Sequence, residues 1–190
     1  MRVITIDFWN TIFDASNGEA RNAERLEAVV QGFEAEGIVV ARDQIGNAFK
    51  MLWSYFDHHW LEHQRTPTSL EMVRELCASL DSSLSERRME AIADVFERGI
   101  LHHPPALLPG VVESLEHLAG HASLALISDT AFSPGRILRE LMERVGIARH
   151  FSAFVFSDET GVAKPHPEAF RRAFQLLDVD ETVDSVHIGD

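Results

Sequence analysis

Four polar residues of this 190-residue chain have the types that a hydrolytic site needs, although they are far apart in the sequence: Asp7, Ser128, Lys164 and Asp190. A carboxylate such as Asp7 can act as a nucleophile toward phosphorus or an activated carbon. A lysine and a hydroxyl can hold a phosphoryl group and neutralise its charge. Two carboxylates can bind a hard cation such as Mg²⁺, which shields an anionic substrate from an anionic nucleophile. These residues form one site if the fold brings them together.

The apolar segments of the chain predict the strands that would do so. Short runs rich in β-branched residues predict strands at 3–6, 123–128, 153–157 and 185–189. Helices are predicted at about 111–118, 134–145 and 167–177, with Ser133 as the N-cap of the second. This alternation favours an α/β fold with a parallel sheet covered on both faces. Ligands of such sheets bind outside the carboxyl ends of the strands, which is where the four polar residues stand.

The segment from about 19 to 102 has a different pattern, with apolar residues at helical spacing and no strand signal. Thr68 with Glu71, and Ser83 with Glu86, form capping-box sequences that predict two helix starts within it. The proline-rich stretch "HHPPALLPG" then predicts a connection back to the first unit. The sequence therefore predicts an all-helical insertion between the first two strands.

Composition narrows the classes of partner. The formal net charge is −13, which disfavours nucleic acid and anionic membranes and favours a small-molecule substrate. The single cysteine, Cys77, excludes an intrachain disulfide and suits a reducing compartment. The first apolar run ends at Asp7, too early for a signal peptide, and no stretch approaches the ~20 apolar residues of a membrane span. These features predict a cytoplasmic protein, and they leave its oligomeric state open.

Four motifs, in order along the chain, resemble those of the haloacid dehalogenase superfamily. "VITIDFWNTIFD" is similar to the first motif, "LALISDT" to the second, "SDETGVAKPHPEAF" to the third and "VHIGD" to the start of the fourth. Each motif alone is weak, but four in the correct order are specific. The resemblance implies a Rossmann-like core from residues 1–15 and 106–190, with a helical cap of the C1 type at 16–105.

The same resemblance implies Mg²⁺ as the cofactor and Asp7 as the attacking nucleophile. The magnesium ligands would be the carboxylates of Asp7 and Asp190 and the backbone carbonyl of Trp9.

The resemblance also implies roles for the residues that hold the substrate. Ser128 and Lys164 would bind the transferred group, and Thr11 would support the loop after the nucleophile. Asn10 and Asp129 would lie against the substrate together with Trp9.

Trp9 is the main departure from the family pattern. Phosphatases of the superfamily have a second aspartate at this position, which protonates the leaving group, whereas indole cannot transfer protons. General acid–base help is typically worth ~10²–10⁴-fold, so phosphatase chemistry is weakened unless another group substitutes. Dehalogenases of the superfamily have tyrosine here, but they lack the metal-binding Gly-Asp sequence.

The family also continues beyond this Gly-Asp, so a chain that stops at Asp190 leaves metal binding open.

Four functions remain open at this stage. We rank magnesium-dependent phosphoryl hydrolysis of a small metabolite first, a catalytically impaired binding protein second and a 2-haloacid dehalogenase third. A phosphonatase that forms a Schiff base through Lys50 is the fourth, since a desolvated lysine can serve as a nucleophile. His58, in the helical insertion, is a candidate for the missing proton donor.

Overall fold

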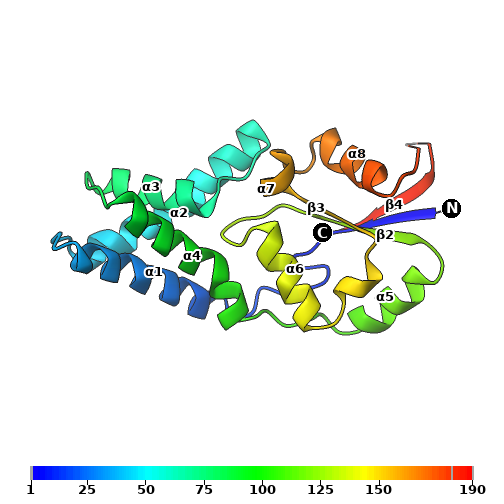
Figure 1. Ribbon diagram of the computed structural model, residues 1–190, viewed down its shortest axis with the longest axis horizontal. Coiled ribbons are helices and arrows are strands. Elements are labelled where there is room, and N and C mark those ends of the chain that lie inside the picture. The colour runs from blue at the N-terminus through cyan, green and yellow to red at the C-terminus, as the bar shows by residue number, and fades with distance from the viewer. Residues whose placement is uncertain (1, 181, 190) are drawn as a thin grey trace.

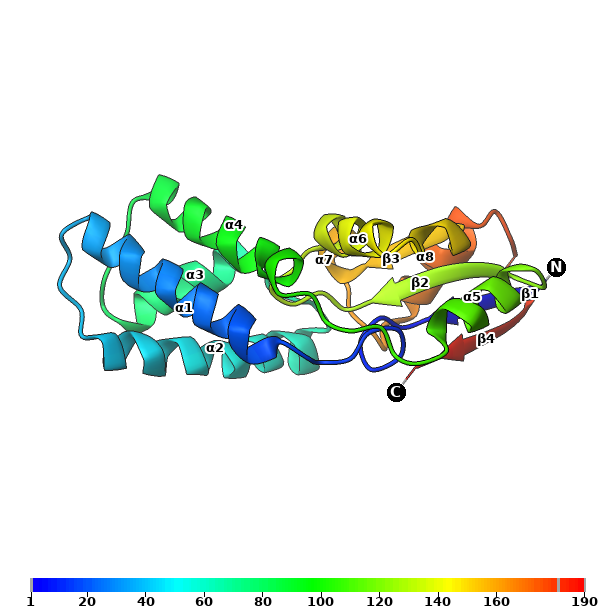
Figure 2. The same ribbon diagram turned by 90° about the horizontal axis from the view of Figure 1, so that it is seen from below.

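The protein, described by a computed structural model over residues 2–180 and 182–189, has two lobes (Figures 1 and 2). One lobe is built on a parallel sheet, and the other consists of helices inserted after the first strand. The predicted fold class is confirmed. Among the described residues, no helix is long and apolar enough to cross a membrane.

The sheet of the described chain has four parallel strands in the order β3-β2-β1-β4. Their bounds are β1 Arg2–Ile6, β2 Ser123–Ser128, β3 Ala153–Phe156 and β4 Asp184–Ile188. Ile6 at the end of β1 is level with Leu126 on β2 and with Ile188 on β4. Because the strands are parallel and level, the segments that follow them emerge at one edge.

Helices cover both faces of the sheet, as a parallel sheet requires. These are α5 Val111–Ala119, α6 Gly135–Arg144, the 3-10 helix η1 Ala148–His150, α7 Ser157–Thr160 and α8 Pro167–Leu176. Leu124 and Leu126 of β2 pack in one core with residues of α5 and α6. The alternate residues Ala125 and Ile127 pack against α8 on the other face. In Figure 1, α8 lies above the sheet and α5 and α6 lie below it.

The helical lobe has its own apolar core. Its helices are α1 Gly18–Ala35, α2 Arg42–His63, α3 Ser69–Ser79 and α4 Glu86–His102. Phe132, from the loop after β2, is part of this core, and its ring centroid lies 5.4 Å from that of Phe96 and 5.2 Å from that of Trp53. The sheet lobe thus inserts an aromatic side chain between the inserted helices. The predicted lobe boundaries at 15/16 and 105/106 fall in the connections outside α1 and α4, and they stay a prediction.

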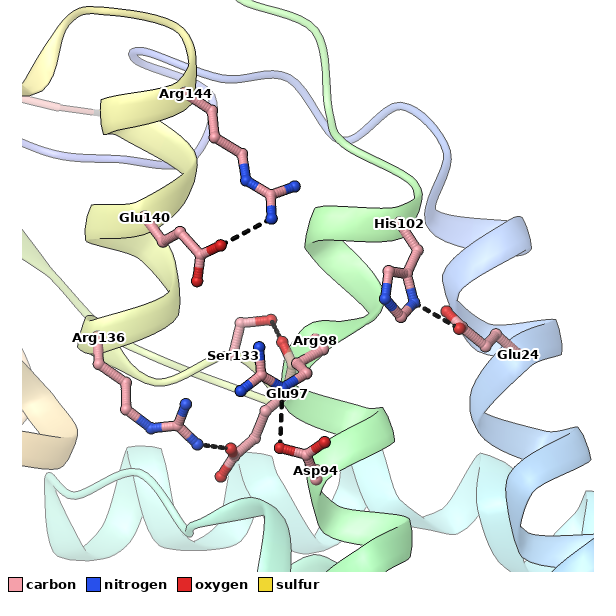
Figure 3. Close-up of polar contacts among 9 residues, drawn as sticks. All are labelled: Glu24, Asp94, Glu97, Arg98, His102, Ser133, Arg136, Glu140 and Arg144. Atoms are coloured by element: carbon pink, nitrogen blue, oxygen red, sulfur yellow. Dashed lines mark hydrogen bonds and ion pairs between the residues drawn. The ribbon is translucent and has the colours of Figure 1, made fainter.

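Polar contacts join α4 to α6 beside this aromatic insertion (Figure 3). The guanidinium of Arg136 pairs with the carboxylate of Glu97, and the Ser133 hydroxyl donates to the Glu97 carbonyl oxygen at 2.9 Å. Burial raises the pKa of Glu97, and Arg136 opposes that shift. The two lobes therefore meet through charged as well as apolar groups.

Two of the predicted helix starts need correction. The Thr68–Glu71 capping box is confirmed, because the Thr68 hydroxyl accepts from the Glu71 amide at 3.2 Å and the Glu71 carboxylate accepts from the Thr68 amide at 2.7 Å. The Ser83–Glu86 box is wrong: α4 begins at Glu86, with Ser85 as its N-cap. The helix predicted to begin at Pro134, with Ser133 as its N-cap, begins one residue later at Gly135, because the Ser133 hydroxyl bonds to α4 instead of capping α6.

Gly135→Ala is expected to destabilise the protein by about 1–3 kcal/mol or more, because its new methyl group would overlap the buried Phe156 ring, 2.5 Å from Cγ. Gly46→Ala is the matched control, since nothing lies within 4 Å of a Cβ there and the position is inside α2. That control is expected to gain about 0.5–1 kcal/mol. The free energy of unfolding of both variants is measured by urea denaturation. Equal values for Gly135→Ala and Gly46→Ala would show that the contact between α6 and β3 rearranges to accept the methyl group.

Candidate active site

Asp7 stands at the carboxyl end of β1 and is held by contacts from three directions. Its Oδ1 lies 2.7 Å from Lys164 Nζ and accepts from the Phe8 amide at 2.7 Å. Its own amide donates to the Ile188 carbonyl of β4 at 2.9 Å. The residue is 8% exposed. The carboxylate is therefore fixed beside a cation at the predicted edge of the sheet.

Asp129, directly after β2, connects Lys164 to the helical lobe. Its Oδ1 accepts from the Lys164 backbone amide at 2.9 Å, and its Oδ2 accepts from Trp60 Nε1 on α2 at 3.0 Å. Burial raises the pKa of Asp129, while the two hydrogen bonds act in the opposite direction. Because both oxygens accept N–H groups, Asp129 positions the lysine segment and the end of α2.

A cavity of about 770 Å³ opens between the two lobes at this edge. The lining residues include an apolar set from both lobes: Trp9, Trp53, Phe56, Trp60, Ile100 and Phe132. The polar and charged lining includes Asp7, Asn10, Arg21, Asn22, Arg25, Asp129, Ser133, Lys164 and His187. The size and mixed lining suit a small organic ligand with at least one anionic group.

Five of the predicted site residues lie on this cavity: Asp7, Trp9, Asn10, Asp129 and Lys164. The Asn10 backbone has a φ of 53°, in the left-handed region, and its amide donates to the Phe13 carbonyl at 2.8 Å. This tight turn after β1 places Trp9 on the cavity wall beside the nucleophile.

Three predicted site residues are placed differently or not described. Ser128 is 1% exposed, its hydroxyl donates to the Asp129 carbonyl at 3.3 Å, and it is not on the cavity wall. Thr11 lies in the turn after β1, also off the wall. Asp190 lies outside the described residues. The strand-end position that suggested Ser128 does not decide whether its side chain faces the ligand space or the interior.

The two candidates from the helical insertion lie away from the cavity. Lys50 is exposed on α2 and lines a separate, smaller hollow with Asp43 and Asn47. His58 is also exposed and pairs with Glu62 at 3.3 Å. Neither side chain lines the space beside Asp7 in this structure.

Three titratable residues on the cavity were not predicted from the sequence: Arg21, Arg25 and His187. The arginines lie four apart on α1, directly ahead of Val29 in the same buried stripe, so their spacing was an available signal. His187 lies on β4 with Nδ1 2.8 Å from the Thr5 hydroxyl. Burial, together with Lys164, lowers the pKa of His187.

The oxygen donors near Asp7 fit a hard cation. The Asp7 carboxylate and the Trp9 backbone carbonyl belong to the turn after β1, and oxygen ligands are those that Mg²⁺ prefers. Among the described residues, no group of three or more His, Cys, Asp or Glu side chains is arranged to hold a metal. Among the described residues, a magnesium ion here would therefore draw on Asp7 and a main-chain oxygen, and its other ligands would be water, substrate oxygens or residues outside the described range.

The family model of the haloacid dehalogenase-like hydrolases matches residues 1–190. The chain belongs to this family. The chain is 27% identical over 161 residues to haloacid dehalogenase-like hydrolase domain-containing protein 3 of Bos taurus, which covers 82% of this chain and 63% of that protein. It is 32% identical over 83 residues to pyrimidine 5'-nucleotidase YjjG of Escherichia coli, covering 44% of this chain and 36% of that protein. The chain thus spans less than two thirds of these relatives.

Solved structures show the same fold. The HAD-hydrolase YfnB from Bacillus subtilis, bound to magnesium, has a TM-score of 0.62 at 19% identity and is matched over 100% of this chain and 78% of its own. The 2-haloacid dehalogenase from Pseudomonas syringae has a TM-score of 0.64 at 20% identity, with the same coverage. The family resemblance inferred from the four motifs is confirmed.

Proposed function

We propose that this haloacid dehalogenase-like hydrolase cleaves a phosphate ester of a small metabolite in a magnesium-dependent reaction, through an aspartyl-phosphate on Asp7. The observation that carries this proposal is the Asp7–Lys164 pair at 2.7 Å on the wall of the 770 Å³ cavity. A carboxylate nucleophile needs a nearby cation to approach an anionic phosphoryl group, and Lys164 supplies that charge.

The reaction has two balanced steps. We assign the attack to Asp7 Oδ2, because Oδ1 already accepts from Lys164 and from the Phe8 amide. An O–P bond forms to Asp7 as the ester O–P bond breaks, and the released alkoxide or aryloxide takes a proton from solvent. Water then attacks the phosphorus and loses a proton to solvent, and the Asp7–phosphate bond breaks to release inorganic phosphate. Lys164 neutralises charge on the phosphoryl oxygens in both steps.

Magnesium would be held by the Asp7 carboxylate and the Trp9 carbonyl, with Asp190 as a further carboxylate ligand. When bound, the ion would polarise the phosphoryl group and offset its charge. Activity is expected to fall to background in excess EDTA and to return on addition of Mg²⁺. Turnover that persists through chelation would contradict the metal requirement.

Trp9 predicts which esters react fastest. Because indole cannot protonate a leaving group, esters with acidic leaving groups are expected to react faster than alkyl esters by about 10²-fold or more. Phosphate release from 4-nitrophenyl phosphate, alkyl phosphates and pyrimidine nucleotides tests this, and the name of the nucleotidase relative supports including the last. Equal rates for aryl and alkyl esters would show that another group, with His187 as the first to examine, donates the proton.

Carbon–halogen hydrolysis is a second candidate because Trp9 puts an aromatic ring where dehalogenases of the superfamily have tyrosine. Here Asp7 would displace halide from carbon and form an ester that water hydrolyses. Halide release from 2-chloropropionate without metal would support it. If neither phosphate nor halide is released by a folded protein that binds phosphate, the binding-only function remains.

A further inference from the structure

Two arginines of α1 lie on the same cavity as Asp7 but belong to the opposite lobe. Arg21 is 6% exposed and Arg25 is 5% exposed, and both side chains line the cavity. They are four residues apart, so they project from one face of the helix. The proposed phosphoryl chemistry uses neither of them.

Arg25 is buried with neutral partners. Its Nε donates to the Phe96 carbonyl at 3.1 Å and its Nη1 donates to the Asn22 side chain at 3.1 Å. Its Cζ lies 4.2 Å from the centre of the Phe132 ring. Among the described residues, no carboxylate lies within 4 Å of this guanidinium, and Nη2 has no hydrogen-bond partner.

Arg21 is likewise buried, and its hydrogen bonds also go to neutral groups. Its Nη1 donates to the carbonyls of Ser16 and His103, both at 2.8 Å, on the two connections between the lobes. Glu24 is the acidic neighbour on α1, but its carboxylate bonds to His102 of α4 at 2.6 Å (Figure 3). In the described part of the chain, neither arginine has an ion-pair partner.

Two buried cations that form no ion pair with a carboxylate are costly to a folded protein, although Asp14 acts electrostatically on Arg21 and Glu24 on Arg25. Burial lowers the pKa of Arg25 to about 9, with Arg21 as a second cause, while Glu24 acts in the opposite direction. Guanidinium groups bind carboxylates and phosphates through paired N–H donors, and each arginine uses only some of its five donors on the protein. An anion in the cavity would offset the cost of burying both charges.

We propose that Arg21 and Arg25 bind a second anionic group of the substrate, in the same cavity as the phosphoryl site on Asp7 and Lys164. The inference rests on the proposed function, since it treats the first anionic group as the one that reacts. The lining of this cavity also includes Trp9, Trp53 and Trp60, which suits an apolar body that joins the two anionic groups. The substrate is thus a phosphate ester with a carboxylate or a second phosphate at its far end.

Binding is measured separately from turnover, so that the two proposals fail independently. Isothermal titration of the whole protein would use ω-phosphonoalkanoates with two to six methylene groups, beside alkylphosphonates and α,ω-bisphosphonates of equal length. Their C–P bonds resist ester hydrolysis. We expect one chain length at which a carboxylate or second phosphonate raises the affinity about 10- to 100-fold over the alkylphosphonate. The terminal group that raises the affinity, carboxylate or phosphonate, identifies the second anionic group of the substrate.

The variants Arg25→Met and Arg21→Met are expected to remove that increment and to leave alkylphosphonate affinity within about 3-fold of wild type. Arg42→Met is the matched control, because it removes a cation of the same lobe that is exposed and pairs with Glu27. Arg25→Lys keeps the charge and is used if Arg25→Met does not fold, with a partial loss expected because lysine lacks the paired donors.

This inference would be overturned if no chain length gave a gain in affinity over the alkylphosphonate, or if both arginine variants kept that gain. The arginines would then only stabilise the two connections between the lobes. Absence of phosphate release from any ester, with the increment present, would instead overturn the phosphatase proposal alone.

Discussion

Asp7→Asn is expected to lower kcat for phosphate esters by about 10⁴-fold or more, since the amide cannot form the aspartyl-phosphate. Asparagine has almost the same shape, and its side-chain oxygen can still accept from the Phe8 amide and from Lys164, which now bind Oδ1. The loss therefore reports chemistry rather than packing. Phosphate release under saturating substrate and Mg²⁺ is the measurement.

Two readouts accompany this variant. Its Tm is expected to stay within about 5 °C of wild type, because a change of 1 kcal/mol moves the Tm of a domain this size by about 2–4 °C. Acid quench of wild type during turnover of ³²P-labelled ester should trap label on the protein, and the variant should trap none. Residual activity near the wild-type rate would remove Asp7 as the nucleophile.

Lys164→Met is expected to lower kcat/KM by about 10²–10³-fold, the usual cost of losing one charge-stabilising donor in a buried site. Lys164 Nζ is the cation beside the Asp7 carboxylate, and its side chain is 18% exposed. Methionine keeps much of the volume but leaves the nucleophile and the phosphoryl oxygens without that charge. Steady-state kinetics with 4-nitrophenyl phosphate measure the effect.

Lys50→Met is the matched control, because it is the same substitution at an exposed position of α2 away from the main cavity. It is expected to leave kcat/KM within about 2-fold of wild type. Lys164→Arg should recover part of the loss, since it keeps the charge with a different shape. Equal kinetics for Lys164→Met and Lys50→Met would show that Lys164 acts only on structure.

The central residues of the site could be predicted because they directly follow strands. Asp7 directly follows β1 and Asp129 directly follows β2, and parallel pairing brings both to one edge whatever the loops do. The order of the four motifs led to the family that the whole-chain match confirms. Capping at Thr68 was also predictable, because it depends only on residues within one turn.

Other features needed distant contacts. Ser133 was expected to cap α6, but its hydroxyl bonds to Glu97 of α4, 36 residues away along the chain. Ser128 ends its strand as predicted, yet its side chain is buried off the cavity wall. The local pattern at Ser133 could not indicate that Glu97 of the other lobe competes for its hydroxyl, and the strand-end position of Ser128 could not indicate which way its side chain faces.

The sequence by itself determined the α/β fold class, the helical insertion, the family, and the carboxylate and lysine that meet beside the cavity. The fold class and the helical insertion follow from periodicity, which acts within a segment, whereas the family and the roles of Asp7 and Lys164 follow from the resemblance of four motifs. Only the tertiary structure decided that Trp60 reaches Asp129 and that Arg21 and Arg25 face the nucleophile's cavity. Those contacts depend on how one lobe docks on the other, because side chains from separate lobes meet through packing and have no fixed spacing in the chain.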